Sequence, residues 1–229
     1  MIAVIPARGG SKGIYKKNIK ILNDKPLIAY TIEEAYKSNV FKKVVVSTDD
    51  EEIAEVSKRY GAEVPFIRPD NISGDLISSD EVVLHTIDFF ERKNQKFDYV
   101  CKLQPTSPLR KAEHIYEAYN MLIDKQADYI VSVCECEHSP LWTSTLDNKY
   151  SLDGFITEAI KMSCRQKLKK YYRLNGAIYM GRTEMVKKNK SFFGKNGYAY
   201  IMKQKDSVDI DNELDFKIAT MILNDHDLL

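Results

Sequence analysis

Blocks of apolar residues alternate with amphipathic stretches along this chain, and they predict strands followed by helices. Short, largely β-branched runs at residues 2–5, 43–48, 99–103 and 129–133 are typical of buried strands. Helical spacing is found in four sets: Ile28, Ile32, Ala35 and Tyr36; Ile53, Val56 and Tyr60; Val83, Ile87 and Phe90; Ile115, Ala118, Tyr119 and Leu122. This alternation predicts an α/β fold of the Rossmann-like type: a mostly parallel sheet with helices on both faces and ligands beyond the carboxyl ends of the strands.

The second half of the chain is less regular. A short strand is expected near Val64–Ile67, and further strands at residues 177–180 and 198–202. A C-terminal helix is also predicted. It is marked by the apolar residues Leu214, Ile218, Met221 and Ile222. Residues 1–229 are expected to form a single domain, in which residues 139–197 contain an arm.

Composition and charge exclude several classes of protein. The 229 residues are 44% hydrophobic and 29% charged, values that are ordinary for a globular protein. The formal net charge of +1 gives no field that would hold nucleic acid or an anionic membrane. Four irregularly spaced cysteines do not form a disulfide framework, and the N-terminal apolar run is too short for a secretory signal. We therefore expect a cytoplasmic protein without nucleic-acid or membrane partners.

The loop after the first strand is the strongest candidate for an anion site. Glycines at positions 9, 10 and 13 let the backbone approach a ligand and direct several N–H groups at one anion. Its cations are Arg8, Lys12, Lys16 and Lys17. The loop therefore predicts polyphosphate binding, although it matches neither the G-x-x-x-x-G-K-[ST] nor the G-x-G-x-x-G fingerprint. An ordinary glycine-rich turn with solvated basic residues is the competing interpretation.

Asp209 and Asp211 are the best metal candidates. Carboxylates two residues apart in extended backbone project the same way, and hard oxygen ligands suit Mg²⁺. The alternative is that Asp211 only caps the last helix.

Two other groups carry weaker signals. Cys134, Cys136 and His138 alternate like a soft-metal site, but their spacing is wrong for zinc and packing explains them better. The acidic block 49–52 is expected to cap the helix that follows it. With no nucleophile elbow, covalent catalysis is disfavoured.

Six stretches together resemble the acylneuraminate cytidylyltransferases, the CMP-sialic acid synthetase family. They are IPARGGSKGIYKKN at 5–18, STD at 47–49, QPTSPLR at 104–110, RQ at 165–166, RLNGAIY at 173–179 and DSVDID at 206–211. The related enzymes for 3-deoxy-manno-octulosonate share the fold but differ in the first loop. The resemblance implies transfer of CMP from CTP to the anomeric hydroxyl of a nonulosonic acid, with release of pyrophosphate.

The same resemblance implies roles for individual residues. Nucleotide binding falls on Arg8, Gly9, Gly10, Ser11, Lys12, Lys17, Asn18, Arg68 and Ser79. Catalytic roles fall on Arg8, Lys12, Lys17 and Asp211, and Mg²⁺ binding on Asp209 and Asp211. Sugar contacts fall on Gln104, Trp142, Arg165, Tyr179, Phe192 and Phe193. The arm implies a homodimer, because in the family it crosses to the other subunit.

Two departures from the family pattern lie near the sugar. Trp142 stands where some sialic acid enzymes have lysine, and Leu174 replaces a proline. N-acetylneuraminic, legionaminic and pseudaminic acid therefore all stay open as substrates. A sugar-1-phosphate nucleotidyltransferase and a non-catalytic CTP-sensing module are the alternative functions.

Overall fold

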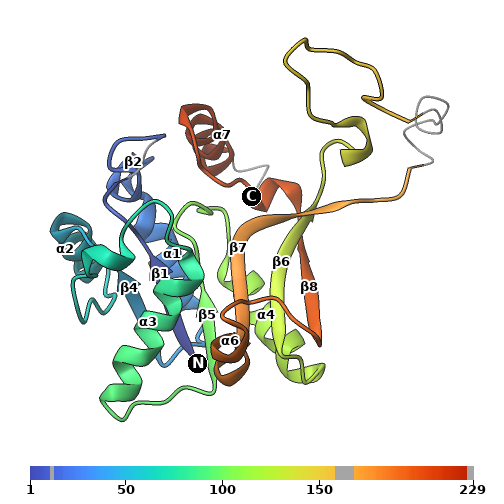
Figure 1. Cartoon of the computed structure of the whole chain (residues 1–229). Coiled ribbons are helices and arrows are strands. Elements are labelled where there is room, and N and C mark those ends of the chain that lie inside the picture. The colour runs from blue at the N-terminus through green and yellow to red at the C-terminus, as the bar shows by residue number, and fades with distance from the viewer. Residues whose placement is uncertain (11–12, 158–167, 226–229) are drawn as a thin grey trace.

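The computed structural model describes residues 1–10, 13–157 and 168–225. A six-stranded sheet forms its centre, and a small two-stranded sheet lies beside it (Figure 1). The strands are β1 Ile2–Pro6, β2 Ile21–Leu22, β3 Lys25–Pro26, β4 Lys43–Ser47, β5 Tyr99–Lys102, β6 Tyr129–Glu135, β7 Tyr172–Arg182 and β8 Gly197–Met202. The α-helices are α1 Leu27–Lys37, α2 Glu51–Arg59, α3 Ser79–Arg92, α4 Ala112–Asp124, α6 Thr183–Asn189 and α7 Glu213–Asn224. Short 3-10 turns lie at Lys17–Ile19, Asp70–Ile72, Pro140–Trp142 and Gln204–Asp206.

The sheet has the strand order β4-β1-β5-β7-β6-β8. Strand β1 pairs in parallel with β4 and β5, and β6 pairs in parallel with β8. Strand β7 runs antiparallel between β5 and β6. The predicted mostly parallel sheet is therefore confirmed, with β7 as the reversed strand. Because of that reversal, the beginning of β7 lies at the edge where its neighbours end.

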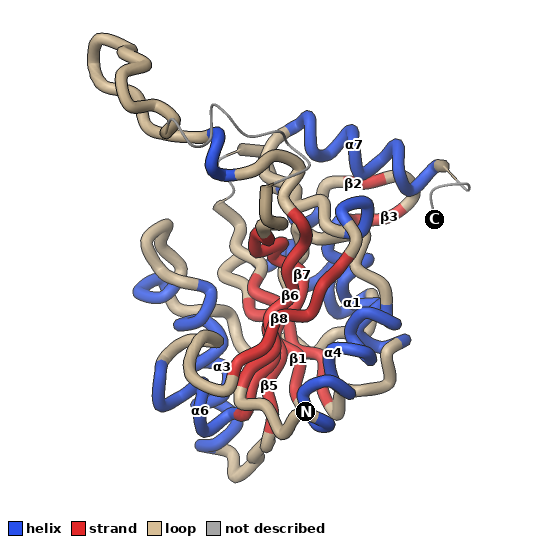
Figure 2. The backbone as a smooth tube through the Cα atoms, turned by 90° about the vertical axis from the view of Figure 1, so that its right-hand side faces the viewer, coloured by secondary structure: helices blue, strands red, loops and turns tan. Residues whose placement is uncertain are grey.

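Helices cover both faces of the sheet, as predicted from the sequence. In Figure 2, α1 and α4 lie on one side of the edge-on sheet, and α3 and α6 lie on the other. The first face packs Ala3 and Ile5 of β1 with Ile28 and Ile115, whereas the second packs Ile2 of β1 with residues of α3 and α6. Alternate residues of one strand thus enter two cores, which is why the strands are apolar on both faces.

The predicted C-terminal helix is confirmed as α7, but the four apolar residues that marked it are not its buried face. Leu214 and Met221 are 65% and 71% exposed, whereas Phe216 and Ala219 are buried. These two residues pack with Leu22 and other apolar side chains of the N-terminal part of the chain. Helix α7 has apolar residues on more than one side, so its periodicity did not identify the buried face.

The short strand expected near Val64–Ile67 needs correction. Residues 64–67 form no strand in the described structure, where only isolated bridges connect Val45 to Glu63 and Thr48 to Ile67. Pro65 lacks the N–H that a regular ladder would need at this point. Tyr36, which shares the helical spacing of Ile28 and Ile32, is 47% exposed, and its hydroxyl donates to the Gly61 carbonyl over 2.6 Å.

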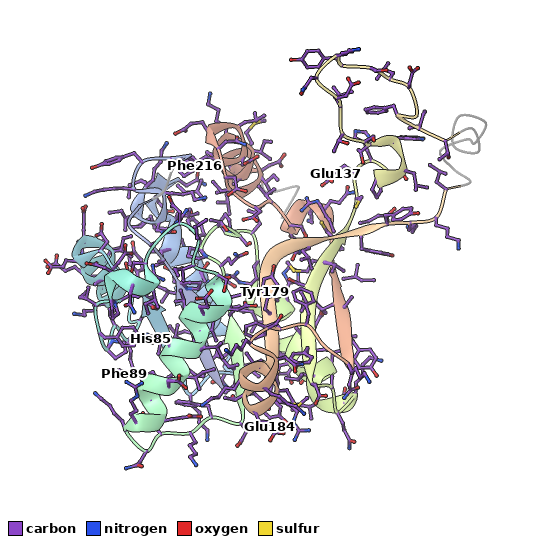
Figure 3. The ribbon with its side chains drawn as sticks, viewed as in Figure 1. His85, Phe89, Glu137, Tyr179, Glu184 and Phe216 are labelled. Carbon is purple, nitrogen blue, oxygen red and sulfur yellow. The ribbon has the colours of Figure 1, made fainter. Side chains whose placement is uncertain are left out.

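Beyond β6 the chain leaves the body of the molecule. Residues 143–157 contain no helix or strand and extend away from the sheet, and β7 leads the chain back (Figure 1). Figure 3 marks Glu137 near the base of this extension, where its carboxylate pairs with Arg173 of β7 over 2.8 Å. No helix within the described ranges is long and apolar enough to span a membrane.

Candidate active site

The loop after β1 is held against the ends of β4 and α2. The Gly9 amide donates to Asp49 Oδ1 over 3.0 Å, and Arg68 contacts the same oxygen over 3.2 Å. A Cβ on Gly9 would lie 2.8 Å from Asp50 Oδ2, so this approach requires glycine. Asp50 caps α2 by accepting from the Ile53 amide, as the sequence predicts for this acidic block. The Gly9 amide is therefore engaged within the protein.

A cavity of about 420 Å³ opens at the carboxyl edge of the sheet, beside this loop. Its lining brings together seven residues that sequence reasoning assigned to the site: Arg8, Lys17, Asn18, Arg68, Ser79, Gln104 and Asp211. They come from both ends of the chain and from three intervening segments. The parallel strand order explains this convergence, because the loops after β1, β4 and β5 meet at one edge.

The N-terminal loop and the C-terminal carboxylates are in direct contact. Lys17 donates from Nζ to the Ile210 carbonyl over 2.6 Å and lies 3.3 Å from Asp211 Oδ1. A Cβ on Gly13 would stand only 2.2 Å from the Asp211 carbonyl oxygen. Any larger residue at position 13 would separate the two segments.

Asp209 and Asp211 differ in environment. Asp209 Oδ1 is buried and has no hydrogen-bond partner among the described residues. Burial raises the pKa of Asp209 above the ordinary value for an aspartate, and the neighbouring Asp211 raises it further. The side chain of Asp211 is 79% exposed. Asn212 caps α7 by accepting from two amides of its first turn, so the interpretation of Asp211 as that cap is wrong.

The buried oxygen of Asp209 fits a cation, because an ionised buried carboxylate is stable only when it is paired or coordinated. Within the described ranges no group of three His, Cys, Asp or Glu side chains could hold a metal. Asp209 and Asp211 could therefore bind a hard ion only together with water or ligand oxygens, which is how Mg²⁺ is commonly held.

Gln104 also lines the cavity, and its side chain lies beside Gly176 of β7 and close to Asp209. A Cβ built on Gly176 would lie 2.5 Å from Gln104 Oε1 and 2.9 Å from Asp209 Oδ2. Arg110, buried beneath this loop, donates to the Gln104 and Ala177 carbonyls over 3.2 and 2.9 Å. The guanidinium thus fixes the loop to β7.

A cluster of aromatic rings adjoins Ser79 on the face covered by α3 and α6. Tyr179 of β7 lies near the centre of the molecule in Figure 3, with ring centroids 6.1 Å from Phe192 and 6.3 Å from Phe193. Tyr179 and Phe192 are buried, and burial raises the pKa of Tyr179 to about 12. Tyr179 is therefore a neutral phenol at physiological pH. Phe193 is 51% exposed.

The structure does not bring every expected residue to this cavity. The residues assigned from sequence that do not line it are Gly9, Gly10, Trp142, Tyr179, Phe192, Phe193 and Asp209. Trp142 ends the 3-10 turn at the base of the extension. Ser11, Lys12 and Arg165 lie outside the described residues.

Sequence reasoning missed three residues of the site. Asp75, in the stretch predicted as irregular, lines the cavity and pairs with Arg8 over 2.7 Å. Asp49 was interpreted as part of a helix cap, but it holds Gly9 and Arg68 instead. Lys102 appeared as one polar residue inside an apolar strand, and that interruption was the only signal it gave.

Fold and site together define an α/β nucleotide-binding enzyme, in which a basic loop and the carboxylate of Asp211 line one cavity and Asp209 lies two residues away along the chain. The model of the cytidylyltransferase family matches residues 2–215. The chain belongs to this family and is a nucleotidyltransferase.

Three curated relatives cover nearly the whole chain. The pseudaminic acid cytidylyltransferase of Campylobacter jejuni is 36% identical over 221 residues, which are 96% of this chain and 95% of that protein. The CMP-N,N'-diacetyllegionaminic acid synthase of Legionella pneumophila is 34% identical, over 97% and 96%. The N-acylneuraminate cytidylyltransferase of Escherichia coli is 38% identical over 97% of this chain, which spans 52% of that protein.

A solved structure shares the fold at low sequence identity. It is a CMP:2-keto-3-deoxy-manno-octonic acid synthetase complexed with CTP, with a TM-score of 0.71, 14% identity and 97% of each chain covered. The likeness supports the Rossmann-like α/β assignment.

Proposed function

We propose that this enzyme transfers CMP from CTP to the anomeric hydroxyl of a nonulosonic acid and releases pyrophosphate. The observation that carries the proposal is the contact between the two ends of the chain, where Lys17 reaches Ile210 and Asp211 beside one cavity. Basic groups and carboxylates in one site suit a triphosphate and its counter-ion. The relatives that act on three different nonulosonic acids support the choice of sugar class.

Positioning and charge neutralisation are the chemistry we assign to the first loop. The sugar hydroxyl attacks the α-phosphorus and gives its proton to water, the bond to the bridging oxygen breaks, and pyrophosphate leaves with that oxygen. Arg8 and Lys17 then neutralise charge that grows on the departing phosphates. We assign the same role to Lys12, and nucleotide binding to Gly9, Gly10 and Ser11. Asn18 fixes the loop by donating to the Arg8 carbonyl over 3.0 Å.

We propose Mg²⁺ as the ion held by Asp209 and Asp211. When bound, it would withdraw charge from the phosphate oxygens and help to orient them. The support is the orphaned oxygen of Asp209 and the exposed carboxylate of Asp211, which together leave positions for water and phosphate oxygens. Lys17 keeps Asp211 close to the loop over 3.3 Å.

We propose that the sugar lies between Gln104 and the aromatic cluster, with Trp142 and Arg165 contributing from the arm. The arm would pack on a second copy of the chain to form a homodimer. Its exposed apolar residues support this, because apolar side chains that stand clear of the body gain from a partner. They are Leu141, Leu146, Tyr150 and Leu152.

We further propose that the reaction takes place in the cytoplasm. The described cysteines, Cys101, Cys134 and Cys136, are free thiols, and the proposed co-substrate is an intracellular nucleotide.

The test is pyrophosphate release with CTP, Mg²⁺ and a panel of N-acetylneuraminic, legionaminic and pseudaminic acid. We expect turnover with at least one of the three sugars and none with a phosphorylated aldose. Asp211→Asn should abolish most of that turnover while circular dichroism and the Tm report an intact fold.

A matched control is Asp124→Asn, which removes an exposed carboxylate at the end of α4, outside the cavity lining and the arm. It should leave turnover unchanged. Turnover with the phosphorylated aldose alone would favour a sugar-1-phosphate nucleotidyltransferase, and silence across the whole panel would contradict the proposed substrate class.

A further inference from the structure

Lys102 is a buried cation at the end of β5, directly behind the cavity wall. Its side chain is 6% exposed, and its ammonium lies 2.5 Å from Asp80 Oδ1 and 2.9 Å from Ser79 Oγ. The ammonium also stands over the Tyr179 and Phe192 rings, at 4.0 and 5.2 Å from their centroids. One carboxylate, one hydroxyl and two ring faces therefore fix its position.

This contact constrains the hydroxyl of Ser79. An ammonium has three donors and no acceptor, so Ser79 Oγ must accept from Lys102. The positive charge also turns the O–H dipole so that its hydrogen points away from Lys102. Ser79 lines the cavity, whereas Lys102 is not among the described residues that do. The hydroxyl hydrogen is thus available to a ligand in the cavity.

We infer that Lys102 is a positioning residue that sets base selectivity by holding the Ser79 hydroxyl as a hydrogen-bond donor. The inference rests on the proposed function, since it needs the base of CTP beside Ser79. Ring nitrogen N3 is an acceptor in cytosine and carries a hydrogen in uracil. A fixed donor on Ser79 would stabilise cytosine N3 and would oppose the N3–H group of uracil. Lys102 and Ser79 together would therefore favour CTP over UTP.

The experiment measures equilibrium binding of CTP and UTP to the full chain by calorimetry, with and without Lys102→Met. We expect CTP affinity to fall about tenfold, the effect of one misaligned hydrogen bond, and UTP affinity to stay within about twofold. The CTP-to-UTP ratio then falls about tenfold. In the Ser79→Ala background, Lys102→Met should leave the ratio unchanged, because the group on which Lys102 acts is gone.

Two further variants keep the test informative if Lys102→Met folds poorly. Lys102→Met with Asp80→Asn removes the buried carboxylate that the single change leaves unpaired. Lys43→Met is the matched control, since this lysine pairs with Glu63 and stands over the Phe90 ring away from the cavity. The double variant should reproduce the loss of selectivity, and the control should retain it.

Equal weakening of CTP and UTP in both Lys102 variants would mean that Lys102 is only structural and would overturn the inference. A retained ratio would overturn it as well, and in both cases the proposed transfer reaction would stand. Wild-type protein that binds neither nucleotide would overturn the proposed function and the inference together.

Discussion

Replacement of Gly176 by alanine, which adds one methyl group, should lower the rate of catalysis much more than it lowers the stability of the fold. The residue lies in β7 with φ of +75°, a conformation that L-residues disfavour. Its missing side chain also lets Gln104 and Asp209 approach the strand. The Cβ of Gly176→Ala would meet Gln104 Oε1 at 2.5 Å and Asp209 Oδ2 at 2.9 Å, both well inside van der Waals contact.

The two effects have different expected sizes. The left-handed backbone costs an alanine ~1–2 kcal/mol, which corresponds to a Tm decrease of roughly 2–8 °C for a chain of this length. Relief of the two short contacts moves the amide and the carboxylate by several tenths of an ångström or more. Misplacement of reacting groups by about 1 Å costs on the order of 100-fold in rate. We therefore expect kcat/KM to fall by about two orders of magnitude.

Gly61→Ala is the control. Gly61 also has a positive φ, of +93°, but the nearest neighbour of its Cβ would be Tyr36 Cε2 at 3.6 Å, an ordinary contact far from the cavity. Both variants should lose similar stability in thermal melts, and only Gly176→Ala should lose pyrophosphate release. Near wild-type turnover of Gly176→Ala, with the same Tm decrease as the control, would refute the reasoning.

Three other changes give distinct signatures. Asp209→Asn should raise the Tm of the ligand-free protein at pH 7 and abolish stabilisation by Mg²⁺ with CTP. Because burial raises the pKa of Asp209, its ionisation destabilises the folded wild-type protein as the pH rises through that pKa. The Tm difference between variant and wild type should therefore vanish below about pH 4. Asp75→Asn should free Arg8 for phosphate and lower the Kd for CTP by no more than about fivefold, since the pair is half exposed and worth at most ~1 kcal/mol; weaker CTP binding would contradict this. Arg110→Met should cost ~2 kcal/mol or more in denaturant unfolding, because the buried Ala177 carbonyl and Thr31 Oγ1 lose the donor they accept from, while the Gln104 carbonyl keeps only bonds of 3.4 Å; a loss below ~1 kcal/mol would argue against that role.

The sequence was sufficient for the sheet and for the elements that carry the site. Apolar runs marked the parallel strands because those strands are buried on both faces and show no polar alternation. The glycine-rich loop and the Asp209-x-Asp211 pair could be identified from sequence for a related reason. Close approach of the backbone requires glycine, and a site with negative charge requires acidic residues. Of the seven cavity-lining residues assigned from sequence, Arg8, Lys17 and Asp211 follow from these features, and the other four came only from the family resemblance.

Contacts between distant segments could not be predicted in the same way. Asp75 and Lys102 belong to the site through partners 67 and 23 residues away, Arg8 and Ser79 respectively. Nothing local distinguishes them from a solvated acid or an interrupted strand. The buried face of α7 had the same difficulty, because the surface that covers Phe216 comes from the first thirty residues of the chain.

The antiparallel direction of β7 explains how residues from both ends of the chain come together in one site. A further parallel strand in that place would have presented its carboxyl end, followed by another crossover, at the catalytic edge. Running antiparallel, β7 instead brings Asn175 and Gly176 there, next to the loop at Gln104. The buried side chain of Asn175 then donates to Ser207 Oγ over 2.9 Å, and Ser207 leads directly into Asp209 and Asp211. Asn175→Ala should therefore weaken the placement of both carboxylates without touching either of them.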